Sequence, residues 1–318
     1  TFVHSGMMYE IRERKSIKAE VHRILQEEVE FSVQQLQKQR QIDLGILQAR
    51  QSFSRINTLL ALLQEAFGEK KFAKTVQRFL LAQEELTELR NFDSLQETLD
   101  VLKSSYRRQN LHAGVDAAMA HLMIWQELAK KEWKEQEEDQ RPAVVTQLEK
   151  ALDKFSLPKK SADDFSLIRT DLEEQYKACK KAFKTSQKKK KNRFQRELLA
   201  EVTTLVLQLQ LFKNCWPEMM NPMIAEFHRL TSLLKHSLNL ALLKDHIEGE
   251  RLIPGRVRGK ADVLNGISEL RDQLQTKSIS VGERIFYPSD KEFLQPISHY
   301  WNLWRQEEPV EQSDSNEK

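Results

Sequence analysis

The chain has 318 residues, of which 31% are charged and 40% are apolar, with only 9 Gly and 8 Pro. Because backbone breakers are scarce and the good helix formers Gln, Glu, Leu, Lys and Arg dominate, this composition favours long helices and argues against a turn-rich β fold. The 50 basic and 47 acidic side chains leave a net charge of +3, so binding of an anion would have to depend on local clusters of charge.

The number of cysteines and the hydropathy of the chain indicate in which compartment the protein works and whether it crosses a membrane. Cys179 and Cys215 are the two cysteines of the chain, too few for a disulfide framework, which fits a reducing cytosol. No apolar run reaches the roughly 18 residues that span a bilayer. The most apolar stretch, residues 198–212, is interrupted by Glu201, Gln208 and Gln210. We therefore expect a soluble, cytoplasmic protein with no membrane partner.

Apolar residues recur at helical spacing along most of the chain. The spacing predicts helices at residues 17–41, 43–67, 69–89, 91–102 and 115–135, with Gly68 ending the second. A charged linker is expected at residues 136–142, because it contains Pro142. Further helices are expected at residues 144–155, 163–187, 194–213, from Trp216–Pro217 onward, and at 238–248, 261–276 and 289–304. The acidic residues after 306 are expected to be disordered.

The two halves of the chain match each other when one is shifted by 149 residues. Apolar residues then coincide: Phe53 with Val202, Ile56 with Leu205, Leu60 with Leu209, Leu63 with Phe212 and Phe67 with Trp216. With a shift of 148, Phe79 coincides with Phe227, Leu86 with Leu234, Asn91 with Asn239, Leu95 with Leu243 and Leu99 with Ile247. One register held across several helices indicates an internal duplication, and hence two helical bundles related by an approximate two-fold axis.

Within these repeats the chain resembles the CHAD family, the conserved-histidine α-helical domain. Residues 9–24 (YEIRERKSIKAEVHRI) resemble the opening helix of the family, and residues 49–60 (ARQSFSRINTLL) its first signature helix. Residues 86–91 (LTELRN) resemble the element that usually ends in Arg-Asp, and residues 285–288 (IFYP) with 299–304 (HYWNLW) resemble its usual ending. The order and spacing of these segments, over nearly the whole chain, make the match specific for the fold.

The resemblance implies an all-α fold of two pseudo-two-fold-related bundles with a central groove or pore. It implies an N-terminal helical repeat at residues 1–136, a C-terminal repeat at 137–306 and an acidic tail at 307–318, forming one domain overall. CHAD proteins are known to bind inorganic polyphosphate through basic residues in the groove. A groove lined by Lys and Arg would neutralise such a linear polyanion and release its counterions.

The signature of the family places His, Arg, Lys and Arg at i, i+3, i+7 and i+10, on one face of a helix. This sequence departs from that pattern. The first repeat has Leu47, Arg50, Ser54 and Asn57, and the second has Arg196, Leu199, Thr203 and Val206. Two of the eight positions are basic, and both of the histidines are absent.

Other basic residues could still line a groove. The candidates for binding polyphosphate or another polyanion are Arg50, Arg55, Lys71, Lys74, Arg78, Arg90 and Lys235. Lys71, Lys74 and Arg78 share a helix face because of their i, i+3, i+7 spacing. The alternative is a solvated helix face on which nearby acids such as Glu69, Glu84 and Glu85 pair with these side chains.

The densest basic cluster is residues 188–191, with Lys180, Lys181, Lys184 and Arg193 nearby. It could hold an anion or a nucleic acid, although a loop with such a charge run is usually only solvated. Aromatic residues such as Tyr300, Trp301 and Trp304 have helical spacing and are expected to fill the core, so nucleic acid is not the partner we favour.

No catalytic or metal-binding motif is recognised. The sequence has no phosphate-binding glycine loop and no nucleophile elbow. His228 and His236 have no Cys or carboxylate that completes a metal tetrad with them. We therefore expect no enzyme activity, no cofactor and no metal. Two hypotheses remain: a non-enzymatic binder of polyphosphate or another polyanion, and a degenerate CHAD scaffold that has lost this binding and acts through a protein partner.

Overall fold

The computed structural model describes residues 9–14, 16–38, 40–84, 92–134, 139–255 and 257–306. This part of the chain is helical and contains no strand. The helices are α1 (Ile17–Leu36), α2 (Ile42–Ala61), α3 (Gln64–Phe67), α4 (Glu69–Glu84), α5 (Phe92–Ser105), α6 (Gln109–Lys134), α7 (Arg141–Asp153), α8 (Ser166–Lys189), α9 (Asn192–Leu211), the short 3-10 helix η1 (Lys213–Cys215), α10 (Pro217–Glu248), α11 (Lys260–Ile285) and α12 (Asp290–Gln306). The all-α fold expected from composition and periodicity is confirmed.

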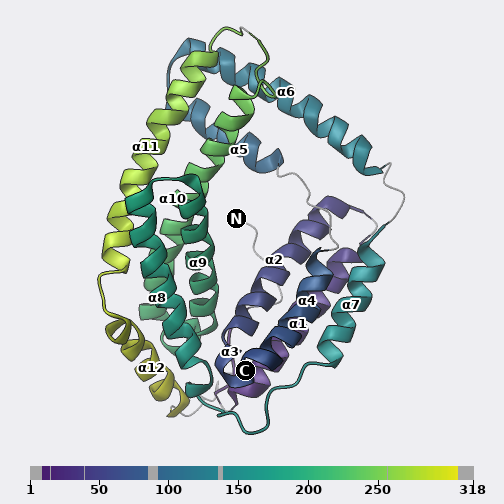
Figure 1. The fold of residues 1–318 in the computed structure, drawn as a ribbon, viewed down its shortest axis with the longest axis vertical. Coiled ribbons are helices and arrows are strands. Elements are labelled where there is room, and N and C mark those ends of the chain that lie inside the picture. Colours follow the sequence, from purple (N-terminus) through teal and green to yellow (C-terminus); the bar gives the residue numbers. More distant parts are fainter. Residues whose placement is uncertain are drawn as a thin grey trace, which may run out of the picture.

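Apolar side chains form two cores. The larger one joins α1–α4 and α7 to α8, α9, α12 and the first half of α10. The smaller one lies between α5, α6, α11 and the second half of α10. Figure 1 shows α1, α2, α4 and α7 as one group of helices, α8–α12 as another, and α5 and α6 above them. The 32-residue α10 contributes to both cores, so it ties the upper part of the molecule to the lower part.

The helix boundaries agree with the internal duplication that the sequence predicts. Helices α2 and α9 are both 20 residues long, and α6 and α11 are both 26 residues long. Helices α1 and α2 pack together as α8 and α9 do, and α5 and α6 pack together as α10 and α11 do. The matched residues Phe53 and Val202, like Ile56 and Leu205, are buried in their own helices. Among the matched apolar residues that the structure describes, Trp216 departs from this pattern, being 44% exposed. The two-fold axis itself stays a prediction.

Several helix boundaries differ from those expected. The helix predicted at residues 43–67 divides into α2 and α3 at Leu62 and Leu63, both of which are fully buried. The predicted separation before residue 238 is wrong: after Pro222 no Gly or Pro interrupts α10. Pro142 lies in the first turn of α7, where a missing N–H costs nothing. Gly68 ends α3 as predicted, with φ at +69°.

The packing crosses the division at residue 136 that the sequence predicts. Helix α7 packs on α1 and α4, whereas α5 and α6 pack on α10 and α11. The smaller core therefore draws helices from both repeats, and the cores do not correspond one to one with the repeats; the domain boundaries stay a prediction. The central groove also stays a prediction, because α2 and α9 are in contact within the larger core. The acidic tail and residues 136–138 of the predicted linker lie outside the described residues.

None of the helices in the described ranges combines the length and the apolar character that crossing a bilayer would require.

Candidate anion-binding site

Three of the candidate cations lie along one exposed face of α4. A neighbouring face of the helix packs into the core through Thr75 and Phe79, which are 6% and 0% exposed. This leaves Lys71 and Lys74 exposed and Arg78 partly exposed. The i, i+3, i+7 spacing that the sequence showed therefore does place the three side chains on one face of the molecule.

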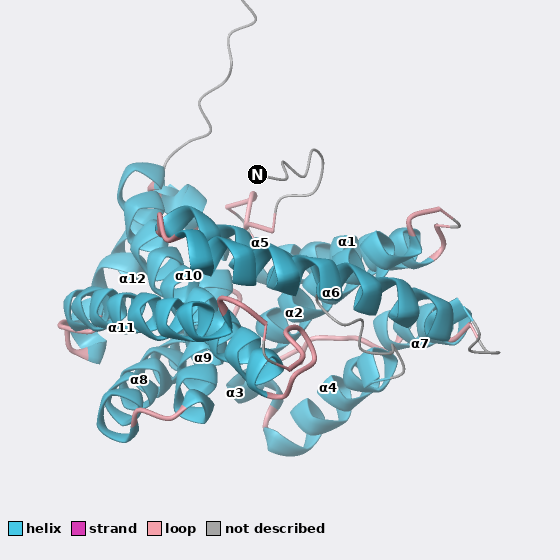
Figure 2. Cartoon of the chain, turned by 90° about the horizontal axis from the view of Figure 1, so that it is seen from above, coloured by secondary structure: helices cyan, strands magenta, loops and turns pink. Residues whose placement is uncertain are grey.

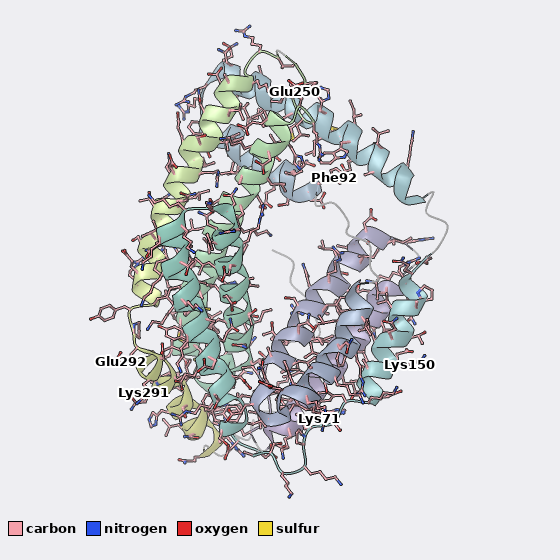
Figure 3. The ribbon with its side chains drawn as sticks, viewed as in Figure 1. Lys71, Phe92, Lys150, Glu250, Lys291 and Glu292 are labelled. Carbon is pink, nitrogen blue, oxygen red and sulfur yellow. The ribbon has the colours of Figure 1, made fainter. Side chains whose placement is uncertain are left out.

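Helix α7 ends against this face. Lys71 Nζ donates to the Ser156 carbonyl oxygen at 3.4 Å, and Arg78 Nη1 donates to the Lys154 carbonyl oxygen at 3.5 Å. These carbonyl groups follow the last residue of α7, Asp153, where unpaired acceptors and the helix dipole attract cations. Figure 3 shows Lys71 at the lower end of the group that contains α4, with Lys150 on the neighbouring α7.

The exposed Lys154 joins this group from α7, so that four cations gather at the α4–α7 junction: Lys71, Lys74, Arg78 and Lys154. We call them the α4–α7 cation cluster. Among the described residues, none of the four makes an ion pair, and Glu69 therefore does not neutralise them as the solvated-face alternative expected. Sequence reasoning missed Lys154, because its proximity to α4 depends on the packing of α7. Glu84 and Glu85 lie outside the described side chains.

Arg55 has a different environment from the α4 cations. Its Nη1 lies 3.1 Å from Glu28 Oε1 across the α1–α2 interface, and the Glu28 side chain is only 5% exposed. Burial raises the pKa of Glu28, and the positive charge of Arg55 offsets this only in part. The guanidinium also lies 5.8 Å from the ring centre of Tyr9, whose hydroxyl donates to the Arg55 carbonyl oxygen. Arg55 is thus engaged within the protein, which argues against a role in ligand binding.

The remaining candidates do not gather with the α4–α7 cation cluster in any contact that the structure shows. Arg50 is partly exposed on α2 and already has an interaction within the protein. Lys235 is exposed on α10. Arg90 lies outside the described residues.

A shallow hollow of about 550 Å³ lies on α5, and none of the candidate cations lines it. It is lined by Asp93, Gln96, Glu97, Asp100, Val101 and Ser104. Three carboxylates make this hollow negative, so it would repel a polyanion rather than bind one.

Both cysteines are free thiols. Cys179 is fully buried, and burial raises the pKa of Cys215 to about 12. A thiol with such a pKa stays protonated at neutral pH and is a poor nucleophile, as is typical of a cysteine that packs as a small apolar group.

Over the described residues, fold and surface together define a helical protein with clustered surface cations. The model of one family, the CHAD domain, matches residues 27–248, which is more than half of the chain. The protein belongs to the CHAD family. The family was the one expected from residues 9–24, 49–60 and 86–91. None of the curated proteins compared with the chain matches it.

Proposed function

We propose that this protein is a non-catalytic, cytoplasmic CHAD protein that binds inorganic polyphosphate or a similar linear polyanion. The observation that carries the proposal is the α4–α7 cation cluster, in which Lys71, Lys74, Arg78 and Lys154 gather without ion-pair partners among the described residues. Membership of the CHAD family supports polyphosphate as the ligand. Free cysteines are compatible with the cytoplasm.

The chemistry of the cluster suits a polyanion. Lysine ammonium groups are compact, mobile point charges that attract phosphate without demanding one geometry. Each phosphate that is neutralised releases condensed counterions, so binding should weaken steeply as salt rises. The hydrogen bonds from Lys71 and Arg78 to carbonyl groups after α7 are long, at 3.4 and 3.5 Å, so a phosphate oxygen could compete for the same donors.

The test is a calorimetric titration with polyphosphate at low and at physiological salt. In the variant Lys71→Gln/Lys74→Gln/Arg78→Gln, we expect affinity to fall, and the slope of log K against log salt to decrease by about 2, or ~0.7 for each lost contact. The control variant, Lys131→Gln/Arg251→Gln/Lys291→Gln, removes the same charge from exposed positions on other elements and should bind normally. Equal weakening in both variants would contradict the assignment.

The alternative is a scaffold that engages a protein partner and has lost polyphosphate binding. It is favoured by the exposed apolar side chains of α6: Met123, Ile124 and Leu128 are 67%, 58% and 53% exposed. The same titration separates the two proposals, because a scaffold of this kind would show no polyphosphate binding at either salt concentration.

A further inference from the structure

The charge of this chain is strongly segregated along the sequence. Residues 175–196 contain ten basic side chains and no acidic one. The rest of the chain has 40 basic and 47 acidic side chains, and is therefore net negative. A surface that concentrates charge of one sign in this way attracts ligands of the opposite sign to a single place.

The contacts show which of these cations are available. Near the N-terminal end of the segment, Lys177 pairs with Glu173 and Glu174 at 2.8 and 2.9 Å, and Lys180 Nζ lies 3.4 Å from Asp290 Oδ1. The other eight make no ion pair within the part of the chain that the structure describes. They are Lys181, Lys184, Lys188, Lys189, Lys190, Lys191, Arg193 and Arg196. We call these eight residues the basic turn.

All eight side chains of the basic turn are exposed. Lys181, Lys184 and Lys188 follow one face of α8 through their spacing of three and four residues. Two residues, Lys190 and Lys191, then connect α8 to the start of α9, where Arg193 and Arg196 are again three residues apart. Figure 2 shows the connection between α8 and α9 at the edge of the molecule. The cations thus continue from one helix, across a convex turn, to the other.

This shape favours a thin, flexible polyanion. A chain that can bend reaches cations on α8, on the turn and on α9 together, whereas a nucleic acid duplex, with a persistence length of about 50 nm, would touch one side. Single-stranded nucleic acid gains affinity by stacking bases on exposed aromatic rings. The aromatic residue of the turn, Phe194, is covered by Lys189 Nζ at 4.9 Å and by the Arg193 guanidinium at 4.4 Å from its ring centre.

We infer that the basic turn is a second polyphosphate-binding site, separate from the α4–α7 cation cluster, and that it makes the protein prefer long chains. This inference rests on the proposed function. A long chain can occupy the turn and the α4–α7 cluster at once, and the second contact then forms at high effective concentration. Tripolyphosphate, with three phosphates, can occupy only one of them.

The experiment compares tripolyphosphate with long-chain polyphosphate in calorimetric titrations. The variant is Lys188→Gln/Lys189→Gln/Lys191→Gln, which leaves Lys190 in its left-handed conformation, with φ at +40°. We expect this variant to bind long chains at least tenfold more weakly than the unmodified protein, with a salt slope smaller by about 2. The ratio of the affinity for long chains to the affinity for tripolyphosphate, each expressed per binding site, should be larger for the unmodified protein than for the variant. The control Lys131→Gln/Arg251→Gln/Lys291→Gln removes the same charge and should behave as the unmodified protein does.

Unchanged affinity of the turn variant for long chains would overturn the inference while leaving the α4–α7 assignment intact. A second result would also overturn it. If the protein bound single-stranded or duplex DNA more tightly than polyphosphate at equal salt, and the turn variant abolished the DNA binding, the turn would be a nucleic acid site. Absence of polyphosphate binding by the unmodified protein would instead overturn the proposed function itself. Unchanged circular dichroism would show that each variant is folded.

Discussion

The ion pair between Arg55 and Glu28 gives a sharp test of whether a candidate ligand-binding arginine is structural. Replacing Arg55 by Met keeps most of its apolar volume but removes the partner of a carboxylate that is 5% exposed. Removing one partner of a buried ion pair typically costs about 3–5 kcal/mol. Because the Arg55 side chain is 25% exposed, we expect the lower end, about 3 kcal/mol of unfolding free energy at pH 7.

The pH dependence of this loss has a definite sign. Burial already raises the pKa of Glu28 above its ordinary value of 4.5, and the variant lacks the positive charge that lowers it. The folded variant therefore takes up a proton at higher pH than the folded parent does. Since the folded state then binds more protons than the unfolded state, stability rises as pH falls. The difference between variant and parent should shrink between pH 7 and pH 5.

Urea unfolding followed by circular dichroism at both pH values measures these quantities. The double variant Arg55→Met/Glu28→Met should recover most of the loss, because replacing both charges by apolar groups is often close to neutral. Polyphosphate affinity should not change in Arg55→Met. A loss of stability that is the same at pH 5 and pH 7, or a double variant no more stable than the single one, would refute the buried-charge explanation.

Two further predictions concern the packing and the N-terminal segment. In Gly282→Ala, the new Cβ would clash with the Phe183 ring, so we expect the free energy of unfolding in urea to fall by about 1–3 kcal/mol. Ser280→Ala on the same helix is the control and should leave stability unchanged; equal stability of the two variants would contradict this prediction. Burial alone would raise the pKa of Glu20, but hydrogen bonds from Arg23 and from the backbone N–H groups of Arg12 and Glu13 outweigh it and lower the pKa. Glu20→Gln should therefore lower the free energy of unfolding by about 2 kcal/mol at pH 7. The difference in stability between parent and variant should diminish as pH falls below about 4.5, because protonation of Glu20 removes this contribution from the parent. A difference that persists at pH 3 would argue against the assignment.

Apolar periodicity predicted the helices well, because burial of one face is a local property of the sequence. Phe53 and Ile56 were recognised as core residues from their spacing, and both are buried. The break between α2 and α3 was missed, because no Gly or Pro marks it and Leu62 and Leu63 are apolar and buried, as Leu59 and Leu60 within α2 are. Local spacing also cannot tell which core a helix joins, so the packing of α7 on α1 and α4 could not be predicted from it.

The candidate site was harder to predict, because spacing does not say what a cation pairs with. Arg55 and Arg78 were both candidates for anion binding from the sequence. Arg55 faces the buried carboxylate of Glu28, whereas Arg78 faces only carbonyl groups after α7. The carboxylate that engages Arg55 comes from α1 and the carbonyl groups near Arg78 from the end of α7, so their roles became distinct only once the helices were packed.

The distribution of unpaired cations also bears on what the loss of the family signature means. Of the eight signature positions, Arg50 and Arg196 are basic, so a groove that relied on this face alone would hold little positive charge. Arg196 belongs at the same time to the basic turn, where seven further cations have no ion-pair partner in the described structure. Positive charge has therefore been depleted along the signature helices but is dense at the N-terminal end of α9. If polyphosphate binding is retained, its electrostatic centre in this protein should lie at that end of α9, and neutralising the turn should cost more affinity for long chains than neutralising Arg50.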